Sequence, residues 1–447
     1  MQNERKISVD ILVQILKSGA YNNISLRAAL AAEVGLNAVQ KAFITEMVNG
    51  VLRNLIYIDY IINSFSKLPV SKMKPFIACV IRCGAYQMLM MDKVPDFAAC
   101  DEAVKMVKHR GFNNLSGFVN GVLRSIAKGG KDVPLPDKNK SAVDYLSVKY
   151  SHPKWIIEYF LIQYDIETVE EICAVNNLPP RISICVNTLK ISRDELIKLL
   201  ENEGVDVEAS PDNNNLLYIK RVGDIAELTA FKEGLFHVMD ESSMRAVLAL
   251  SPSKGDTIID MCAAPGGKSF YIAYLMGNTG EIYAHDIFEH KINLINGGAK
   301  RLGISNIKTQ IQDAAVMNER FLTSADKVLV DVPCSGLGII RKKPDIKYHK
   351  SMDDIIALSD IQRSILKTAA LYVKPDGILV YSTCTLSKIE NEDNARWFAD
   401  NYPFELLSME TYLPKADGGD GFFVAIYKAV DILEHSRLSH VNLRHRT

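Results

Sequence analysis

The stretch from Thr257 to Met276 constrains the fold of this chain more than any other part of it. Thr257-Ile-Ile-Asp260 is a short β-branched run, which predicts a buried strand. Pro265-Gly266-Gly267 follows, and glycine lets the chain reverse there without a Cβ penalty. The amphipathic run that begins at Ser269 predicts a helix over 267–276. A strand, a glycine turn and a helix together place backbone N–H groups and a helix N-terminus beside a nucleotide-like ligand.

Acidic residues stand at the ends of the strands predicted next. Asp286 ends the second strand, about twenty residues beyond the glycines, where an acid suits ribose hydroxyls. Asp313 follows the third strand, and Asp331 ends the fourth, just before Pro333-Cys334. A Gly-Gly pair after a strand is most often only a tight connection, and this loop is neither G-x-G-x-x-G nor a P-loop. The ordered set of strand ends, more than the turn, favours a ligand site at the carboxyl edge of a sheet.

Strands and helices alternate from residue 236 to residue 430 at the spacing of βαβ units. This pattern predicts an α/β fold, a Rossmann-like domain with its functional loops on one edge of the sheet. The predicted strands are 257–260, 281–286, 308–312, 327–331, 377–382 and 422–427. The predicted helices between them are 267–276, 289–301, 353–373 and 390–400.

The rest of the chain divides by pattern and composition. Residues 1–128 carry apolar residues at helical spacing and predict an all-α domain. Residues 129–140 are rich in Gly, Pro and Lys and predict a linker. Residues 141–235 predict a small α+β domain, and the tail 431–447 has no clear signal. Within the small domain, helices are predicted over 154–164 and 193–203, and strands over 181–186 and 216–220.

Composition excludes several classes of protein. Hydrophobic residues make up 48% and charged residues 23%, which is typical of a soluble globular protein and not of a disordered or membrane one. The longest apolar stretch, Pro75 to Met91, contains Arg82 and is too short for a membrane span. The first residues do not combine a charged stretch with an apolar one, so we expect no secretory signal. The eight cysteines form no C-x-x-C pair, so neither a disulfide framework nor a metal site is expected. We therefore expect reduced thiols and a cytoplasmic location.

Four motifs carry a resemblance to a known family. They are Cys262-Ala-Ala-Pro-Gly-Gly-Lys268, Asp331-Val-Pro-Cys-Ser-Gly336, Arg341-Lys-Lys-Pro-Asp-Ile-Lys347 and Tyr381-Ser-Thr-Cys-Thr385. Together they resemble the S-adenosylmethionine-dependent RNA cytosine-5 methyltransferases, and most closely the bacterial RsmB/Sun group. That group modifies small-subunit ribosomal RNA and carries an N-terminal NusB-like domain. The resemblance implies a NusB-like RNA-binding domain over 1–128 and an RNA-recognition-like unit over 141–235.

Two cysteines qualify as the nucleophile that such a reaction needs. A thiolate that adds to C6 of cytosine makes C5 nucleophilic enough to accept a methyl group. Cys334 and Cys384 both follow predicted strands, and the residues alone do not choose between them. Cys334 stands in the Pro-Cys context that DNA cytosine-5 methyltransferases use. The resemblance implies that Cys384 is the nucleophile and that Cys334 assists breakdown of the adduct and release of the product.

The resemblance also assigns the cofactor residues. The backbone of Cys262, Ala263, Ala264, Pro265, Gly266 and Gly267 is expected to hold the methionine part of S-adenosylmethionine, with Lys268 at the helix start. Asp286 is expected on the ribose, Asp313 on the adenine side and Asp331 between the methyl donor and the base. Cys262 is given no thiol chemistry. Near the pocket, four basic residues either meet RNA phosphates or belong to a solvated loop: Arg341, Lys342, Lys343 and Lys347.

Small-subunit ribosomal RNA is the expected partner, and the protein is expected to be monomeric with no membrane contact. Residues 1–140 hold 19 Lys and Arg against 11 Asp and Glu, which suggests a polyanionic partner, although a solvated helical surface explains this charge equally well. A phosphate-contacting surface is expected from Arg53, Lys105, Lys108, His109, Arg110 and Arg124. The alternatives are a methyltransferase for another RNA such as transfer RNA, for DNA or for a small molecule, and a non-catalytic RNA-binding or antitermination factor.

Overall fold

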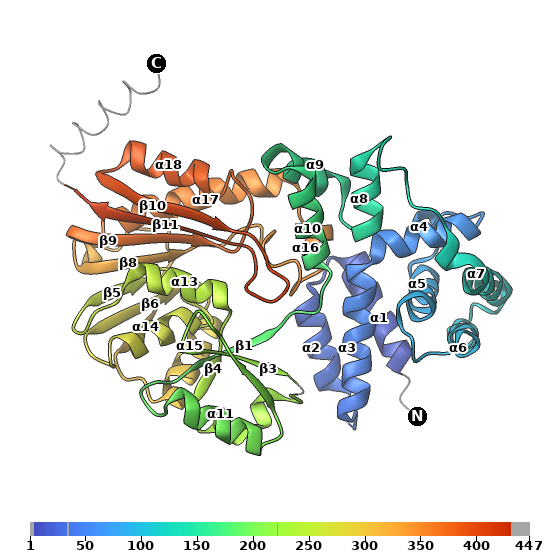
Figure 1. Cartoon of the computed structure of the whole chain (residues 1–447), viewed down its shortest axis with the longest axis horizontal. Coiled ribbons are helices and arrows are strands. Elements are labelled where there is room, and N and C mark those ends of the chain that lie inside the picture. The colour runs from blue at the N-terminus through green and yellow to red at the C-terminus, as the bar shows by residue number, and fades with distance from the viewer. Residues whose placement is uncertain (1–3, 34, 221, 431–447) are drawn as a thin grey trace. The chain divides into compact units, whose positions relative to one another are not determined.

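The computed structural model describes residues 4–33, 35–220 and 222–430, so the tail predicted over 431–447 lies outside the described residues. The chain forms two compact units (Figure 1). Unit 1 holds the residues up to Pro179 together with the segment Ile340–His349. Unit 2 holds the residues from Pro180 to Ile339 and those from Lys350 onward. The chain therefore enters unit 1 twice.

Unit 1 is helical, as predicted for residues 1–128. Its apolar core contains Cys79, Cys83 and Cys100. Arg82 lies on α5, the most buried helix, and forms a bidentate ion pair at 2.7 Å with Asp59. No helix among the described residues is long and apolar enough to cross a membrane. The helices are α1 (Glu4–Ser18), α2 (Asn22–Ala32), α3 (Ala38–Arg53), α4 (Leu55–Phe65), α5 (Pro75–Met90), α6 (Asp96–His109), α7 (Ser116–Gly129), α8 (Ala142–Tyr150), α9 (Lys154–Gln163), α10 (Ile166–Asn176) and α16 (Ile346–His349).

The segment Ile340–His349 is buried within unit 1 by contacts with distant helices. Lys347 donates from Nζ to the carbonyl of Arg53 at 2.8 Å, and the Tyr348 hydroxyl donates to the carbonyl of Leu52 at 2.8 Å. Lys347 is 1% exposed, Arg341 2% and Arg53 7%. The prediction that these three side chains contact RNA phosphates is therefore wrong, because packing shields them from solvent.

Unit 2 begins with a small antiparallel sheet. Its strands are β1 (Ile182–Val186), β2 (Asp206–Ala209), β3 (Leu216–Lys220) and β4 (Phe236–Val238), in the order β2-β3-β1-β4. The helices α11 (Arg193–Asn202) and α12 (Thr229–Lys232) pack with it around a core that includes Ile184, Leu196 and Phe236. Helices α8 to α10, which the sequence groups with this domain, belong to unit 1. The boundaries at 141 and 235 stay predictions.

A seven-stranded sheet forms the centre of unit 2. Its order is β10-β11-β9-β8-β5-β6-β7. Strands β7, β6, β5, β8 and β9 run parallel, whereas β11 is antiparallel to β9 and β10. The strands are β5 (Thr257–Asp260), β6 (Glu281–Asp286), β7 (Ile307–Ile311), β8 (Ala325–Asp331), β9 (Val373–Thr383), β10 (Phe404–Tyr412) and β11 (Phe422–Ala429). All six predicted strands are confirmed, and β10 was missed.

Helices cover both faces of this sheet (Figure 1). One face packs against α13 (Glu241–Leu250), α14 (Gly267–Leu275) and α15 (Glu289–Leu302), and the other against α17 (Met352–Ala370) and α18 (Glu392–Asn401). Neighbouring residues alternate between the two cores, Ile258 on the first face and Ile259 on the second. The Rossmann-like fold class is confirmed. The predicted site residues stand at or just after the carboxyl ends of β5, β6, β7, β8 and β9.

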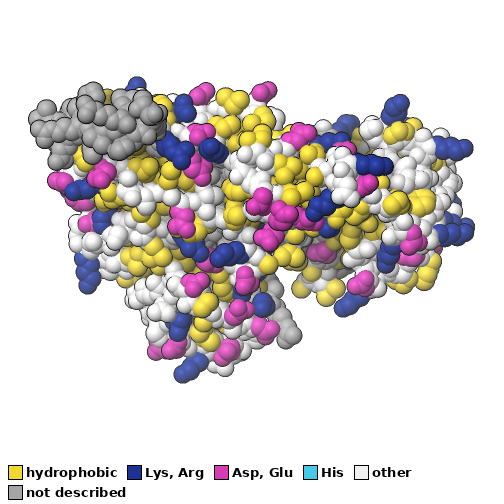
Figure 2. Space-filling model, turned by 45° about the horizontal axis from the view of Figure 1, so that its top comes forward, with side chains coloured by type: hydrophobic (Ala, Val, Ile, Leu, Met, Phe, Trp, Pro, Cys, Tyr) yellow, Lys and Arg dark blue, Asp and Glu magenta, His cyan; other side chains and the backbone are white. Residues whose placement is uncertain are grey.

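The charged side chains are mixed on the face that Figure 2 draws. Among the described residues, Lys and Arg stand there between Asp, Glu and hydrophobic side chains, so no area of one sign covers this face.

Candidate active site

The glycine turn joins β5 to α14 as predicted. Gly266 has φ +109°, a left-handed conformation that favours glycine, and a Cβ there would overlap the ring of Phe270. The peptide bond between Ala264 and Pro265 is cis. The N–H of Ala263 donates to the carbonyl of His285 at 2.8 Å, which fixes the turn to the neighbouring strand β6. These contacts hold the loop between β5 and α14 in one conformation, with the N-terminus of α14 at its end.

A cavity of about 150 Å³ opens beside this turn. It brings together predicted cofactor residues and several that the sequence did not indicate. The predicted ones are Cys262, Ala263, Ala264, Pro265, Gly267, Lys268 and Asp331, and the others are Val238, Met239, Asp240, Ser243 and Asp260. The Asp240 side chain accepts from the backbone N–H of Ser242 and caps α13, so a helix-start signal at 240–243 could have indicated this part of the wall.

Asp260 is the most informative residue that the prediction missed. It is 0% exposed, and its Oδ2 accepts a hydrogen bond from the Ser269 hydroxyl at 2.6 Å. Its Oδ1 has no hydrogen-bond partner among the described residues. Burial raises the pKa of Asp260 to about 6, against the hydrogen bond from Ser269 and the charge of Lys268. A buried carboxyl oxygen without a partner, in the wall of a cavity, suits a cationic ligand group.

Lys268 and Asp331 form an ion pair at 2.7 Å beside the same cavity. Burial lowers the pKa of Lys268, but the charge of Asp331 and the hydrogen bond to it outweigh burial and raise it overall. The other oxygen of Asp331 accepts from the Ser382 hydroxyl at 2.8 Å. Ser382 lies two residues before Cys384, so Asp331 connects the cavity wall to the second cysteine turn.

The two candidate nucleophiles lie together. The Sγ atoms of Cys334 and Cys384 are 3.1 Å apart, one after β8 and one after β9. Both are partly exposed, as is Cys262, whereas the other five cysteines are buried. The hydrogen bond with Cys384, followed by burial, raises the pKa of Cys334 well above its ordinary value. Neither sulfur lines the cavity, but Asp331, which is three residues before Cys334 and accepts from Ser382, does.

Asp286 and Asp313 are not part of the cavity wall. Asp286, at the end of β6, accepts from the backbone N–H of Phe288 at 3.2 Å and pairs with Lys291 at 3.3 Å. Asp313 is exposed and accepts from the backbone N–H of Ala315 at 2.9 Å. Both follow strands of the sheet, and their contacts with ribose and adenine stay predictions.

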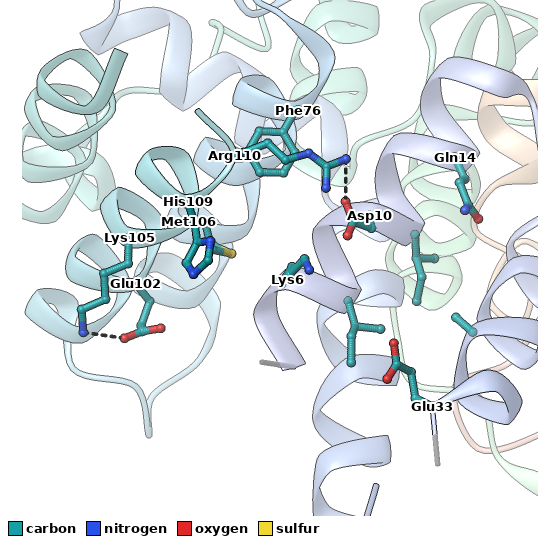
Figure 3. Close-up of a pocket in the computed structure, with 13 residues that line it drawn as sticks. Lys6, Asp10, Gln14, Glu33, Phe76, Glu102, Lys105, Met106, His109 and Arg110 are labelled. Atoms are coloured by element: carbon teal, nitrogen blue, oxygen red, sulfur yellow. Dashed lines mark hydrogen bonds and ion pairs between the residues drawn. The ribbon is translucent and has the colours of Figure 1, made fainter. Parts of the chain in front are cut away.

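A larger cavity, of about 760 Å³, lies in unit 1 between α1, α2 and α6 (Figure 3). Lys105 pairs with Glu102 at 2.9 Å, and Arg110 with Asp10 at 3.6 Å. Figure 3 shows Arg110 across the ring of Phe76, with its guanidinium 5.1 Å from the ring centre. Opposite charges are thus balanced within this cavity, and its predicted phosphate contacts stay predictions.

A doubly wound sheet, a glycine turn at its carboxyl edge and a cavity beside that turn define the class of Rossmann-like, nucleotide-cofactor enzymes to which many methyltransferases belong. Three sequence families match successive parts of the chain. The NusB family matches residues 2–128, the RsmF/B-like ferredoxin-like domain residues 152–226, and the 16S rRNA methyltransferase RsmB/F family residues 247–428.

The chain belongs to the 16S rRNA methyltransferase RsmB/F family. It is 39% identical, over 414 residues and 92% of each chain, to the probable ribosomal RNA small subunit methyltransferase B of Bacillus subtilis (strain 168). It superposes on the crystal structure of PH0851 with a TM-score of 0.80 and 29% identity, covering 96% of this chain and 99% of that one. NSun6 from Pyrococcus horikoshii, solved with SFG, gives a TM-score of 0.57 and 26% identity over 62% of this chain and 98% of that one.

Proposed function

We propose that this protein forms 5-methylcytosine in small-subunit (16S) ribosomal RNA, with S-adenosylmethionine as methyl donor and a covalent adduct between Cys384 and C6 of the base. The observation that carries the proposal is the pair of sulfurs 3.1 Å apart at the ends of β8 and β9. Asp331, in the wall of the cavity beside the glycine turn, accepts from Ser382 two residues before Cys384 and pairs with Lys268. The relative from Bacillus subtilis, a probable small-subunit methyltransferase, supports the choice of RNA.

The cavity fits one end of the methyl donor. When bound, S-adenosylmethionine supplies a methyl group on a positively charged sulfur. The unpartnered Oδ1 of Asp260 offers a negative partner for the cationic methionine portion, and the N-terminus of α14 offers backbone N–H groups. A volume of about 150 Å³ holds only part of such a ligand. Its nucleoside portion would extend toward Asp286 and Asp313, which lie outside the cavity wall.

The two cysteines divide the chemistry on the base. The Cys384 thiolate adds to C6, and C5 accepts the methyl group. A water molecule then takes the C5 proton while the C6–S bond breaks, which restores the ring and releases the Cys384 thiolate. The choice of Cys384 as the sulfur that reacts rests on the family resemblance, in which the cysteine of the second motif is the nucleophile. Cys334 then assists breakdown of the adduct. Asp331 holds the edge of the cytosine through its carboxyl group.

The substrate must present a flipped or single-stranded cytosine, because the C6 atom of a base stacked in a duplex is not accessible to a protein thiolate. The NusB-like portion of unit 1 supplies RNA contacts, with Lys105, Lys108, His109, Arg110 and Arg124 as candidates. We place the protein in the cytoplasm as a monomer. The proposed reaction needs no metal.

Single-cysteine variants test the mechanism. Cys384→Ala is expected to lower methyl transfer to 16S ribosomal RNA by about 10³-fold or more, because the nucleophile is lost. Cys334→Ala is expected to accumulate a protein–RNA adduct that survives denaturing electrophoresis. Cys100→Ala, outside the site, is the matched control and is expected to turn over normally. Rapid turnover by Cys384→Ala would overturn the mechanism, and methylation of DNA but not RNA would overturn the substrate.

A further inference from the structure

A buried carboxylate lies behind the two cysteine turns. Glu390 belongs to the segment between β9 and α18 and is fully buried. Its Oε1 accepts hydrogen bonds from the backbone N–H of Ser335 at 2.8 Å and from Nε2 of Gln362 at 3.0 Å. Its Oε2 accepts from the Ser335 hydroxyl at 2.5 Å. One side chain thus holds both the main chain and the side chain of the residue that follows Cys334.

The same network reaches the residue that follows Cys384. The Ser335 and Thr385 hydroxyl oxygens are 2.7 Å apart. Asn391, next to Glu390, donates from Nδ2 to the carbonyl of Thr385 at 2.9 Å. Gln362, which donates to Glu390, also donates to the carbonyl of Pro333 at 2.9 Å. The network therefore binds each of the two turns at residues adjacent to its cysteine.

A carboxylate is a costly side chain for this position. Burial raises the pKa of Glu390 above its ordinary value, because the charged form loses its hydration. An apolar side chain of similar volume would avoid that cost but would leave the Ser335 N–H without its acceptor and the Gln362 amide with only the Pro333 carbonyl. A buried network in which every polar group has a partner holds the chain in one arrangement and disfavours alternative arrangements. Here the geometry that it fixes is the approach of the two turns.

We propose that Glu390 is a positioning residue that holds the sulfurs of Cys334 and Cys384 at contact distance. It does so by binding the residue after Cys334 directly and the residue after Cys384 through the Ser335 hydroxyl. The consequence for catalysis rests on the proposed function, because only that reaction needs both thiols at one base. The spacing of the sulfurs does not rest on it and is measured separately.

The spacing can be read from disulfide formation in the full-length protein without RNA or methyl donor. Hydrogen peroxide takes two electrons from the thiols, an S–S bond forms between Cys334 and Cys384, and the two protons and the peroxide leave as two waters. The rate depends on how closely the thiols are held. Mass spectrometry of the linked peptides gives this rate, and methyl transfer to 16S ribosomal RNA gives kcat and KM on the same preparations.

Two substitutions at Glu390 separate position from charge. Glu390→Ala is expected to slow disulfide formation about tenfold, because its donors lose their acceptor and the turns separate. Glu390→Gln is expected to stay within about threefold of the parent, since the amide oxygen still accepts from the Ser335 N–H and the hydroxyl can rotate to accept from the amide N–H. Glu405→Gln, on the exposed face of β10, is the control and is expected to match the parent.

Ser335→Ala keeps the test decisive if Glu390→Ala does not fold, because it removes only the hydroxyl bridge. It is expected to slow disulfide formation about threefold. The proposal is overturned if this variant, and Glu390→Ala where it folds, form the disulfide as fast as the parent protein. In the methylation assay, Glu390→Ala is expected to have a lower kcat than the parent and an unchanged KM for the methyl donor. A parent protein without methyl transfer would refute the proposed function, while the peroxide rates would still decide the role of Glu390.

Discussion

Replacing Asp260 by Asn is expected to change how the stability of unit 2 depends on pH. Asp260 is fully buried, and burial raises its pKa from an ordinary 3.8 to about 6. Because the folded-state pKa is raised, the proton stabilises the folded protein fully below pH 3.8, and this stabilisation is lost as the pH rises through about 6. The Asn side chain keeps an oxygen that can accept from Ser269 and carries no titrating proton.

The size of the effect follows from the shift in pKa. One pKa unit corresponds to about 1.4 kcal/mol, so ionising Asp260 costs the folded state about 3 kcal/mol more than the unfolded chain. About 1.4 kcal/mol of this cost develops between pH 5 and pH 8. Asp260→Asn is therefore expected to gain about 1.4 kcal/mol relative to the parent over that interval.

Urea unfolding followed by tryptophan fluorescence measures this difference. The chain has two tryptophans, Trp155 in unit 1 and Trp397 in unit 2, so a Trp155→Phe background reports on the unit that contains Asp260. The exposed Asp400→Asn is the control, and its difference from the parent is expected to stay constant with pH. The reasoning is refuted if Asp260→Asn differs from the parent by the same amount at pH 5 and at pH 8.

Two further predictions concern unit 1. Lys347 is 1% exposed, and burial lowers its pKa to about 7. A depressed lysine pKa costs stability most below pH 7, whereas Met leaves the carbonyl of Arg53 without its donor at every pH. Relative to the parent, Lys347→Met is therefore expected to be more stable at pH 6 than at pH 9 by about 3 kcal/mol, by urea unfolding followed at Trp155. The same difference from the parent at both pH values would contradict this. A Cβ at Gly50 would overlap the Tyr86 hydroxyl, so Gly50→Ala is expected to cost about 3 kcal/mol, whereas Gly117→Ala, with open space around it, is expected to leave the melting temperature unchanged or higher. The Gly50 prediction fails if both variants melt alike.

The sequence was most informative where local signals agree. The β-branched run at 257–260 and the glycines after it predicted β5 and the start of α14 at their observed residues. β10 was missed because it is a half-exposed edge strand whose Glu, Ser and Thr residues weaken its apolar alternation. α13 was missed although Asp240 offered a helix-start signal.

Other features depend on contacts between residues distant in the sequence. Arg341 and Lys347 were predicted to lie in an exposed basic loop. In the structure, helices from the other end of the chain bury them. Glu390 stands in an acidic, polar stretch that gives no sign of burial. Cys334 and Cys384 were predicted to follow neighbouring strands. The residues alone could not show that the two sulfurs would be in contact.

The double entry of the chain into unit 1 has a consequence for its synthesis on the ribosome. The helices up to Pro179 leave the exit tunnel first, yet the segment Ile340–His349 that completes their packing is translated about 160 residues later. At elongation rates of about 5–20 residues per second this is a delay on the order of ten seconds or more. During that interval the nascent helical unit exposes the surface that Tyr348 and Lys347 later cover, so its maturation waits for most of the catalytic sheet to be made.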